Sequence, residues 1–330
     1  MLVITNRALS SKLQATGVDS DKAFGEKQNS LGINEIRLAH VYRKNKKWEV
    51  KLVPEQDEKE RTDANLPSRV EFNKTIARCK ENGRDCLIYV HGFGKSFKEA
   101  LEQAEYIEKC YNVEVVMFTW PTNPGGFVTM EYRDVKRIAL ASTGAFDRVM
   151  ERIGKYLSEP GFDRSSLLSC GVHLNLMTYS MGNFLLQHYV LSDYYGRETD
   201  MFTNVILCQA DCDNVGHEAW LHKLIAGQRI YVTINEKDKI LGWSEAQNQR
   251  DRLGRTARNL IASNTIYVDF TGGENVGNTH QLWGEVDHDT VISFFSACFK
   301  GERAEELSGF SYDSRMNAYR IQRDTKKVKQ

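Results

Sequence analysis

Six short apolar segments, each followed by a helix-like or loop stretch, constrain the fold of this chain most strongly. They are Cys86–Val90, Val113–Phe118, Val172–Met177, Val205–Cys208, Arg229–Ile234 and Thr265–Phe270. Strands without a polar side belong in a parallel sheet that helices cover on both faces. The longest helix is expected from about Asp134 to Leu157, and the last core helix from His288 to Phe299. This order predicts an α/β fold with a mostly parallel, twisted sheet.

The first part of the chain shows a two-residue alternation, as antiparallel strands do. Ile36, Leu38, His40 and Tyr42 alternate with other residues before the basic turn 43–47, and Trp48, Val50 and Leu52 do so after it. We expect antiparallel strands within residues 1–55, a charged loop over 55–61, and a helix with Pro67 in its first turn and Gly83 at its end. Residues 1–302 are predicted to form one domain, and residues 303–330 a frayed, charged surface tail whose basic end, 326–329, is an alternative docking segment.

The composition excludes several classes of protein. Lys and Arg number 44, as do Asp and Glu, so no overall field attracts nucleic acid or anionic membranes. No apolar run reaches eighteen residues, so we expect no membrane span, and the first residues lack the features of a signal peptide. The 7 cysteines are scattered and mostly lie in apolar segments, as expected for reduced thiols in a cytoplasmic protein.

The third apolar strand ends in the stretch Thr178-Tyr179-Ser180-Met181-Gly182-Asn183. A serine with small residues two positions before and after it is typical of a nucleophile elbow, in which strand and helix pass close to a strained turn. Gly182 fits this pattern. Thr178 replaces the usual first glycine and requires that its methyl group face a gap in the helix above. By itself, the stretch also fits a chance Ser-x-Gly in a strand–helix turn.

The order of later residues favours the elbow. Asp238 follows the strand Arg229–Ile234, and His280 follows the strand Thr265–Phe270. An acid and then a histidine at successive strand ends is the order in which this type of hydrolase presents its catalytic groups. The sequence therefore predicts Ser180 as nucleophile, His280 as general base and Asp238 as the acid that orients the base.

The glycine-rich turn His91-Gly92-Phe93-Gly94-Lys95-Ser96 has two interpretations. A phosphate loop needs glycine five residues before Gly94, where the chain has Tyr89, so that motif fails. Asp211 beyond an apolar strand imitates a second nucleotide-site motif, which leaves the nucleotide hypothesis as an alternative. In the hydrolase interpretation, the backbone N–H groups of Phe93 and Met181 form an oxyanion hole, and His91 braces the turn.

With these motifs in place, the chain resembles an α/β-hydrolase, and more narrowly a bacterial α/β-hydrolase family of uncharacterised function. The matching motifs are His91-Gly92-Phe93 with Phe97, Phe118-Thr119-Trp120-Pro121, Tyr132 and Asp134, Ser180-Met181-Gly182-Asn183, Asn235-Glu236-x-Asp238, Arg252-Leu253-Gly254 and His280. The similarity extends over roughly Cys86 to Phe299. It implies the triad Ser180, Asp238 and His280 and implies no substrate, because the family has no agreed one.

Other residues compete for the acid and base. Asp211 follows the preceding strand and is the alternative acid; Asp213 is less well placed. His288 begins the last core helix, so a capping role is expected there and His280 is preferred as base. His217 and His222 are five residues apart rather than four, which argues against a zinc site on one helix face and favours a solvated pair.

We expect a serine hydrolase that cleaves carboxylic esters or thioesters, without metal or cofactor, and whose partner is a small acyl substrate. The loop after the second apolar strand, with Trp120 and Tyr132, is a candidate for the substrate groove, although Trp120 fits the core equally well. The alternatives are an acyltransferase or amidase with the same triad, and a catalytically inactive hydrolase fold that serves as a binding module.

Overall fold

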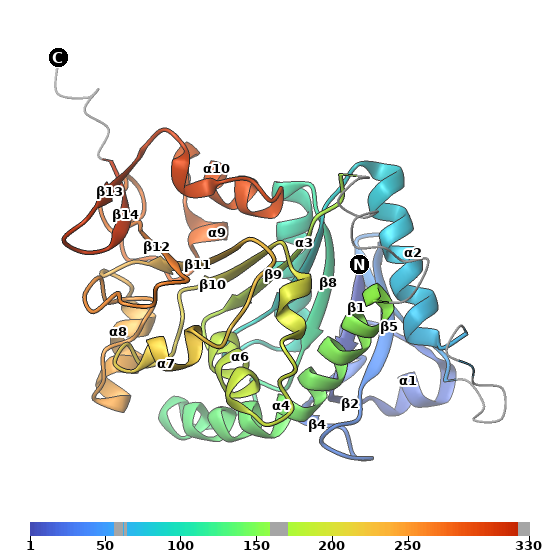
Figure 1. Ribbon diagram of the computed structural model, residues 1–330. Helices are drawn as coiled ribbons and strands as arrows, with labels where there is room; N and C mark the ends of the chain where they lie inside the picture. Colours follow the sequence, from blue (N-terminus) through green and yellow to red (C-terminus); the bar gives the residue numbers. More distant parts are fainter. Residues whose placement is uncertain (56–61, 63–64, 159–170, 323–330) are drawn as a thin grey trace.

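The computed structural model describes residues 1–55, 62, 65–158 and 171–322, and twelve strands of these residues form one mixed, mostly parallel sheet (Figure 1). The strands are, in their order across the sheet, β13 (Phe310–Asp313), β14 (Ala318–Ile321), β12 (Ile266–Asp269), β11 (Arg229–Ile234), β10 (Asn204–Cys208), β9 (Leu174–Tyr179), β7 (Cys86–Val90), β8 (Glu114–Thr119), β1 (Leu2–Thr5), β5 (Arg37–Lys44), β6 (Lys47–Leu52) and β3 (Val18–Asp19). The predicted strands therefore form, with shifts of one or two residues at their ends.

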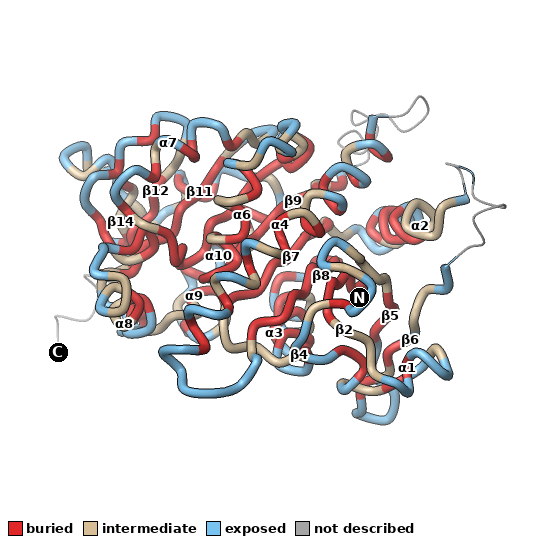
Figure 2. Tube along the Cα trace, turned by 90° about the horizontal axis from the view of Figure 1, so that it is seen from below, coloured by how far each residue is buried: buried red, intermediate tan, exposed pale blue. Residues whose placement is uncertain are grey.

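Helices cover both faces of the sheet. α2 (Pro67–Asn82), α4 (Val128–Ser158) and α6 (Gly182–Leu191) pack on one face, and α3 (Phe97–Tyr111), α9 (Leu282–Glu285) and α10 (Asp289–Phe299) on the other. A sheet that is covered on both faces needs apolar residues at every position of its strands. In β7, Ile88 packs in the core on the α2, α4 and α6 side, and Leu87 packs in the core on the α3, α9 and α10 side. Figure 2 shows the resulting band of buried residues along the central strands.

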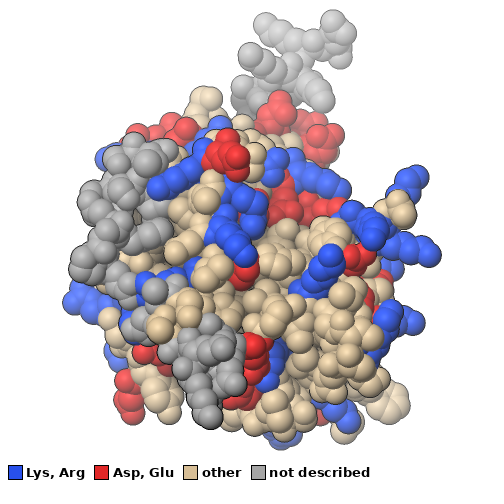
Figure 3. All heavy atoms as spheres, turned by 90° about the vertical axis from the view of Figure 1, so that its right-hand side faces the viewer, with Lys and Arg blue, Asp and Glu red and all other residues tan. Residues whose placement is uncertain are grey.

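Smaller elements complete the chain. They are β2 (Arg7–Leu9), α1 (Ser11–Thr16), β4 (Phe24–Gln28), α7 (His217–Leu221) and α8 (Lys239–Asn248), with short 3₁₀ helices at Glu198–Met201 and Ala304–Glu306. β2 and β4 pair with each other outside the large sheet. On the side of the molecule seen in Figure 3, basic and acidic side chains of the described residues are intermixed.

The N-terminal strands are antiparallel only in part. β5 pairs antiparallel with β6 and with β1, as the alternation predicted. β1 also pairs with β8, and this pairing is parallel. The first strand of the chain therefore joins the antiparallel strands to the parallel sheet, and the segment after it, β2, lies beside the turn that follows β7. The predicted loop over 55–61 lies almost entirely outside the described residues.

The prediction of a frayed tail from residue 303 is wrong for the part that the structure describes. β14 pairs in parallel with β12, and β13 pairs antiparallel with β14. The Arg320 Nε donates to the Asp269 Oδ2 at 3.1 Å, and the Phe310 ring packs against Phe270. These contacts anchor the hairpin to the exposed edge of β12. The basic segment 326–329 lies outside the described residues.

Candidate active site

Ser180 lies in the turn between β9 and α6, in a strained backbone conformation. Its φ is 53°, in the left-handed region that residues with a side chain seldom adopt. Two hydrogen bonds hold this conformation: the Ser180 N–H donates to the Cys208 carbonyl at 3.0 Å, and the Ser180 carbonyl accepts from the Asp211 N–H at 3.2 Å. The turn is thereby attached to the end of the neighbouring strand β10.

Two glycines make room for this turn. A Cβ atom at position 182 would lie 2.8 Å from the Val90 carbonyl oxygen and 2.9 Å from that of His91, so α6 approaches β7 too closely for any side chain. A Cβ atom at position 92 would lie 2.6 Å from the Cβ of Ser180. Gly182 therefore has the steric role that the motif predicted, and Gly92 brings the turn after β7 against the serine.

Thr178 and Asn183 form a hydrogen-bonded brace beneath the serine. The Thr178 hydroxyl donates to the Asn183 Oδ1 at 2.6 Å. The Asn183 Nδ2 in turn donates to the carbonyl oxygens of Thr178, Ser180 and Cys208 at 3.0–3.1 Å. Threonine at the first position of the elbow is thus explained by its hydroxyl, and not only by a gap for its methyl group. The signal in the sequence for this brace was the pair of polar residues on either side of the serine, Thr178 and Asn183.

The structure brings His280 between Ser180 and Asp238. The His280 Nε2 lies 2.9 Å from the Ser180 Oγ, and its Nδ1 lies 2.6 Å from the Asp238 Oδ2. Because a carboxylate only accepts, the proton of the neutral ring lies on Nδ1, and Nε2 is free to accept the serine proton. This is the geometry of a nucleophile, its base and an orienting acid.

Asp238 is held in place by the helix that it begins. It is the N-cap of α8, and its Oδ1 accepts the backbone N–H groups of Ile240 and Leu241, each at 2.9 Å. Its other oxygen remains for His280. The carboxylate is fully buried, and the positive end of the helix stabilises its negative charge. One residue therefore caps the helix and contacts the imidazole.

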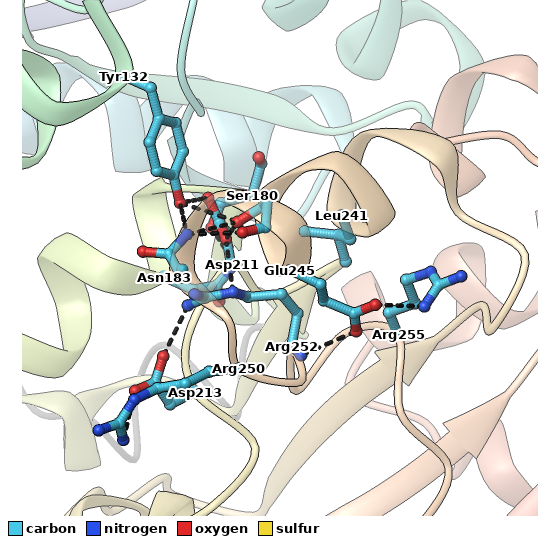
Figure 4. A network of polar contacts seen from close by, with 12 residues as sticks. Tyr132, Ser180, Asn183, Asp211, Asp213, Leu241, Glu245, Arg250, Arg252 and Arg255 are labelled. Carbon is cyan, nitrogen blue, oxygen red and sulfur yellow. Dashed lines mark hydrogen bonds and ion pairs between the residues drawn. The ribbon is translucent and has the colours of Figure 1, made fainter. Parts of the chain in front are cut away.

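The carboxylate of Asp211, the alternative acid, contacts side chains other than His280, in a buried network that reaches Ser180 through the backbone (Figure 4). It accepts hydrogen bonds from the Tyr132 hydroxyl at 2.9 Å and from the Ser244 hydroxyl at 2.5 Å. Arg252 places its Nε 3.6 Å from the Asp211 Oδ1 and donates through Nη1 to the Asp213 Oδ1 at 2.7 Å. Within the described part of the chain, the Asp211 carboxylate is thus engaged by Tyr132 of α4, Ser244 of α8 and the Arg252 guanidinium, and not by His280.

The two predicted oxyanion donors, the backbone N–H groups of Phe93 and Met181, belong to chain neighbours of the groups that meet at the serine. Phe93 follows Gly92, which packs against Ser180, and Met181 follows Ser180 and is buried. Among the described residues, neither N–H group donates to another protein group. Two unpaired N–H donors near a serine are suited to bind the oxyanion that forms when the serine attacks the carbonyl carbon of an ester.

His91 and Trp120 are structural residues of the turn after β7. His91 is fully buried, and its ring contacts the Gly92 carbonyl and the Thr119 hydroxyl at 3.0 and 2.8 Å. Burial, followed by the charge of Arg7, lowers the pKa of His91 to about 3. Trp120 is also fully buried, donates to the His91 carbonyl at 3.2 Å and stacks on its ring. Of the two alternatives for Trp120, a substrate groove and the core, the structure therefore shows the core position.

Tyr132 also lies inside the molecule rather than along a groove. It is buried, and its ring packs edge-to-face against Phe93 and against Trp243. Its hydroxyl is engaged with Asp211, and burial together with this carboxylate raises the pKa of Tyr132. The helix that carries it begins earlier than predicted, at Val128. Phe93 and Trp243, which are half-buried, form the apolar surface in front of it.

The Gly94-Lys95-Ser96 stretch leads into helix α3, and its last residue caps that helix. Ser96 is the N-cap of α3: its hydroxyl accepts from the Glu99 N–H, while the Glu99 carboxylate accepts from the Ser96 N–H at 2.9 Å. A carboxylate of the chain therefore lies where a phosphate would bind a helix N-terminus. This arrangement argues against the nucleotide interpretation.

Two other histidines that the sequence offered as site residues, His288 and His217, have structural roles. His288 is the N-cap of α10 and accepts from the Thr290 N–H, which is the capping role that was predicted. His217 was expected in solvent but is buried, with its ring between the Asn214 carbonyl and the Tyr267 hydroxyl at 2.5 and 2.6 Å. Within the described part of the chain, no group of three or more His, Cys, Asp or Glu side chains is arranged to hold a metal ion.

A comparison with protein families matches residues 68–264 to a family described as an alpha/beta hydrolase of unknown function (DUF900). The match covers more than half of the chain and confirms the predicted fold and resemblance. It begins with α2 and ends before β12, so that Arg7 and His280 lie outside it. No curated protein and no solved structure gives a significant match. None of the helices in the described ranges is long and apolar enough to cross a membrane.

Proposed function

The chain belongs to the DUF900 family of alpha/beta hydrolases, and we propose that it is a serine hydrolase that cleaves carboxylic esters or thioesters with Ser180, His280 and Asp238. One observation carries the proposal: a single imidazole lies 2.9 Å from the Ser180 Oγ and 2.6 Å from the Asp238 Oδ2. Both distances are those of hydrogen bonds. The strained φ of Ser180 supports the same role, since strain of this kind concentrates at functional sites.

In the first half of the reaction, the Ser180 Oγ attacks the carbonyl carbon of the substrate. The His280 Nε2 takes the serine proton, and the imidazolium that forms is stabilised by Asp238. The two helix N–H groups that hold the Asp238 Oδ1 fix this carboxylate, so that its other oxygen faces the ring. When the tetrahedral intermediate collapses, the C–O or C–S bond breaks and His280 protonates the leaving alcohol or thiol.

The oxyanion of the intermediate would be bound by the Phe93 and Met181 N–H groups. Each such donor is worth about 10²–10³ in turnover in serine hydrolases. Backbone donors have the advantage that their direction is set before the substrate binds. In the second half of the reaction, a water molecule gives its proton to His280 and attacks the acyl-enzyme, which releases the acid and regenerates Ser180.

The test is hydrolysis of p-nitrophenyl esters of increasing acyl length by the wild type, by Ser180→Ala and by Ser263→Ala. Ser263 lies on an exposed loop and is the matched control. The wild type and the control should turn over at least one ester at the same rate, while Ser180→Ala loses at least a thousandfold. Equal turnover by Ser180→Ala would show that another group is the nucleophile.

A further inference from the structure

A buried arginine of the N-terminal strand β2 contacts the turn that carries the proposed oxyanion donor. The side chain of Arg7 is fully buried, and its charge is paired with Glu26 at 2.5 Å. Its Nε donates to the Thr119 Oγ1 at 2.9 Å, and its Nη2 donates to the Lys95 carbonyl at 2.9 Å. Thr119 ends β8, and Lys95 ends the turn 91–95, so one guanidinium reaches both.

The direction of the hydrogen bonds beyond Arg7 follows from chemistry. A carbonyl oxygen only accepts, so the His91 Nδ1 carries the ring proton and donates to the Gly92 carbonyl at 3.0 Å. The Nε2 of the neutral ring therefore accepts from the Thr119 hydroxyl at 2.8 Å. The Thr119 oxygen in turn accepts from the Arg7 Nε, because a guanidinium only donates. The depressed pKa of His91 agrees with a neutral ring that accepts at Nε2.

The Gly92 carbonyl belongs to the same peptide unit as the Phe93 N–H. A peptide unit is planar, and in its trans form the C=O and N–H bonds point in opposite directions. Fixing the carbonyl therefore fixes the N–H at the other end of the unit. The series of hydrogen bonds from Arg7 through Thr119 and His91 therefore ends on the peptide unit whose N–H is the proposed oxyanion donor.

We propose that Arg7 is a positioning residue, which clamps the turn 91–95 at both ends and thereby aims the Phe93 N–H at the substrate oxygen. One end is held through Thr119, His91 and the Gly92 carbonyl, and the other through the Lys95 carbonyl. Glu26, the partner of Arg7, extends the clamp, because its Oε1 accepts the Phe97 N–H of α3 at 3.3 Å. Arg7 and Glu26 both lie outside the matched residues 68–264, so the N-terminal strands supply part of the active site. The expected effect of the clamp on turnover rests on the proposed function, whereas its effect on the order of the turn 91–95 does not.

The test uses Thr119, because a change there breaks one arm of the clamp and keeps the buried ion pair of Arg7. Thr119→Val removes the hydroxyl at constant shape, and Thr119→Ser keeps it. Arg78→Met, which breaks the ion pair with Glu114 at the other end of β8, is the control for a general loss of stability. Amide hydrogen exchange is followed over residues 91–97, and esterase kinetics are measured on the same proteins.

In Thr119→Val, exchange over 91–97 should rise about tenfold, and kcat should fall about tenfold to a hundredfold with KM within twofold, since a small misplacement of a catalytic group has effects of this size. Thr119→Ser and Arg78→Met should match the wild type in both readouts. Unchanged exchange and kcat in Thr119→Val would overturn the clamp. If no protein hydrolyses an ester, the proposed function fails, and the exchange measurement still decides for or against the clamp.

Discussion

Replacing Asp238 with asparagine should stop catalysis and leave the protein folded. The carboxylate accepts three hydrogen bonds: one from the His280 Nδ1–H at 2.6 Å and two from the Ile240 and Leu241 N–H groups at 2.9 Å. An asparagine has one acceptor oxygen. With this oxygen toward the helix, both N–H bonds remain, and asparagine is as good an N-cap as aspartate. The reverse orientation loses those two bonds, at about 1 kcal/mol each.

The orientation that keeps both helix N–H bonds is therefore preferred, and it turns the asparagine NH₂ group toward the His280 Nδ1. The imidazole then takes the other tautomer, with its proton on Nε2 and directed at the Ser180 Oγ. A base in this form cannot accept the serine proton. The corresponding loss in serine proteases is about 10⁴ in turnover, or about 5 kcal/mol of barrier.

Asp211→Asn should lower the stability of the protein and largely preserve its turnover. It removes the negative charge from a buried site that accepts from Tyr132 and Ser244 and lies 3.6 Å from Arg252. Arg252 keeps its contact with Asp213, so we expect a loss of about 1–3 kcal/mol in the free energy of unfolding. Turnover per folded molecule should stay within about tenfold of the wild type, because the hydrogen bonds and ion pairs of the Asp211 carboxylate do not involve the imidazole.

The assay is kcat for any accepted ester, together with urea unfolding followed by tryptophan fluorescence. We expect a loss of at least a hundredfold in kcat for Asp238→Asn at an almost unchanged unfolding midpoint, and a lowered midpoint with substantial activity for Asp211→Asn. If Asp211→Asn abolishes turnover and Asp238→Asn does not, the assignment of the orienting acid is wrong.

Three further predictions follow from the fold and the elbow. Thr178→Val leaves the Asn183 Oδ1 buried without its donor and should lower the free energy of unfolding by about 1–3 kcal/mol, whereas Thr178→Ser should not; equal urea midpoints for the two variants would contradict this. Because the pKa of His91 is lowered to about 3 in the folded protein, the unfolded chain binds an extra proton between about pH 6.5 and 3. Stability should therefore fall as the pH drops through this range, by at most about 1.4 kcal/mol per pH unit from this group, and His91→Gln should flatten the dependence measured by urea unfolding at pH 4.5, 5.5 and 6.5. Deletion of residues 303–330 should lower the melting temperature below that of the chain truncated after residue 322, which keeps β13 and β14; identical melting temperatures for both truncations would show that the hairpin adds nothing.

The fold was predictable because the signals for its central part are local. A strand buried on both sides is apolar at each position, and β7, β9 and β10 show this directly. The positions of Asp238 and His280 were predictable because parallel strands bring their carboxyl ends to one edge of the sheet. The order of these residues in the chain was therefore enough to indicate that they meet.

The supports of the site were harder to predict because they depend on contacts distant in sequence. Arg7 reaches Thr119 over more than a hundred residues, and nothing in the local pattern of β2 shows that this arginine is buried. Trp120 was ambiguous because an aromatic residue at a strand end fits a groove and a core equally well. The β13–β14 hairpin was missed because its two strands have only four residues each and its contacts are with residues distant in the sequence: β14 pairs with β12, and the Phe310 ring packs against Phe270 and Phe294.

The central claim is that Ser180 is a nucleophile activated by His280, and a fluorophosphonate probe tests it most directly. The probe is incubated with the wild type, Ser180→Ala and the Ser263→Ala control, and the adduct is located by mass spectrometry of the intact proteins and their peptides. We expect one phosphonyl group on the wild type and the control, attached to the peptide that contains Ser180, and none on Ser180→Ala. An unmodified wild type, as expected for a catalytically inactive binding module, or an adduct that persists in Ser180→Ala would contradict the account.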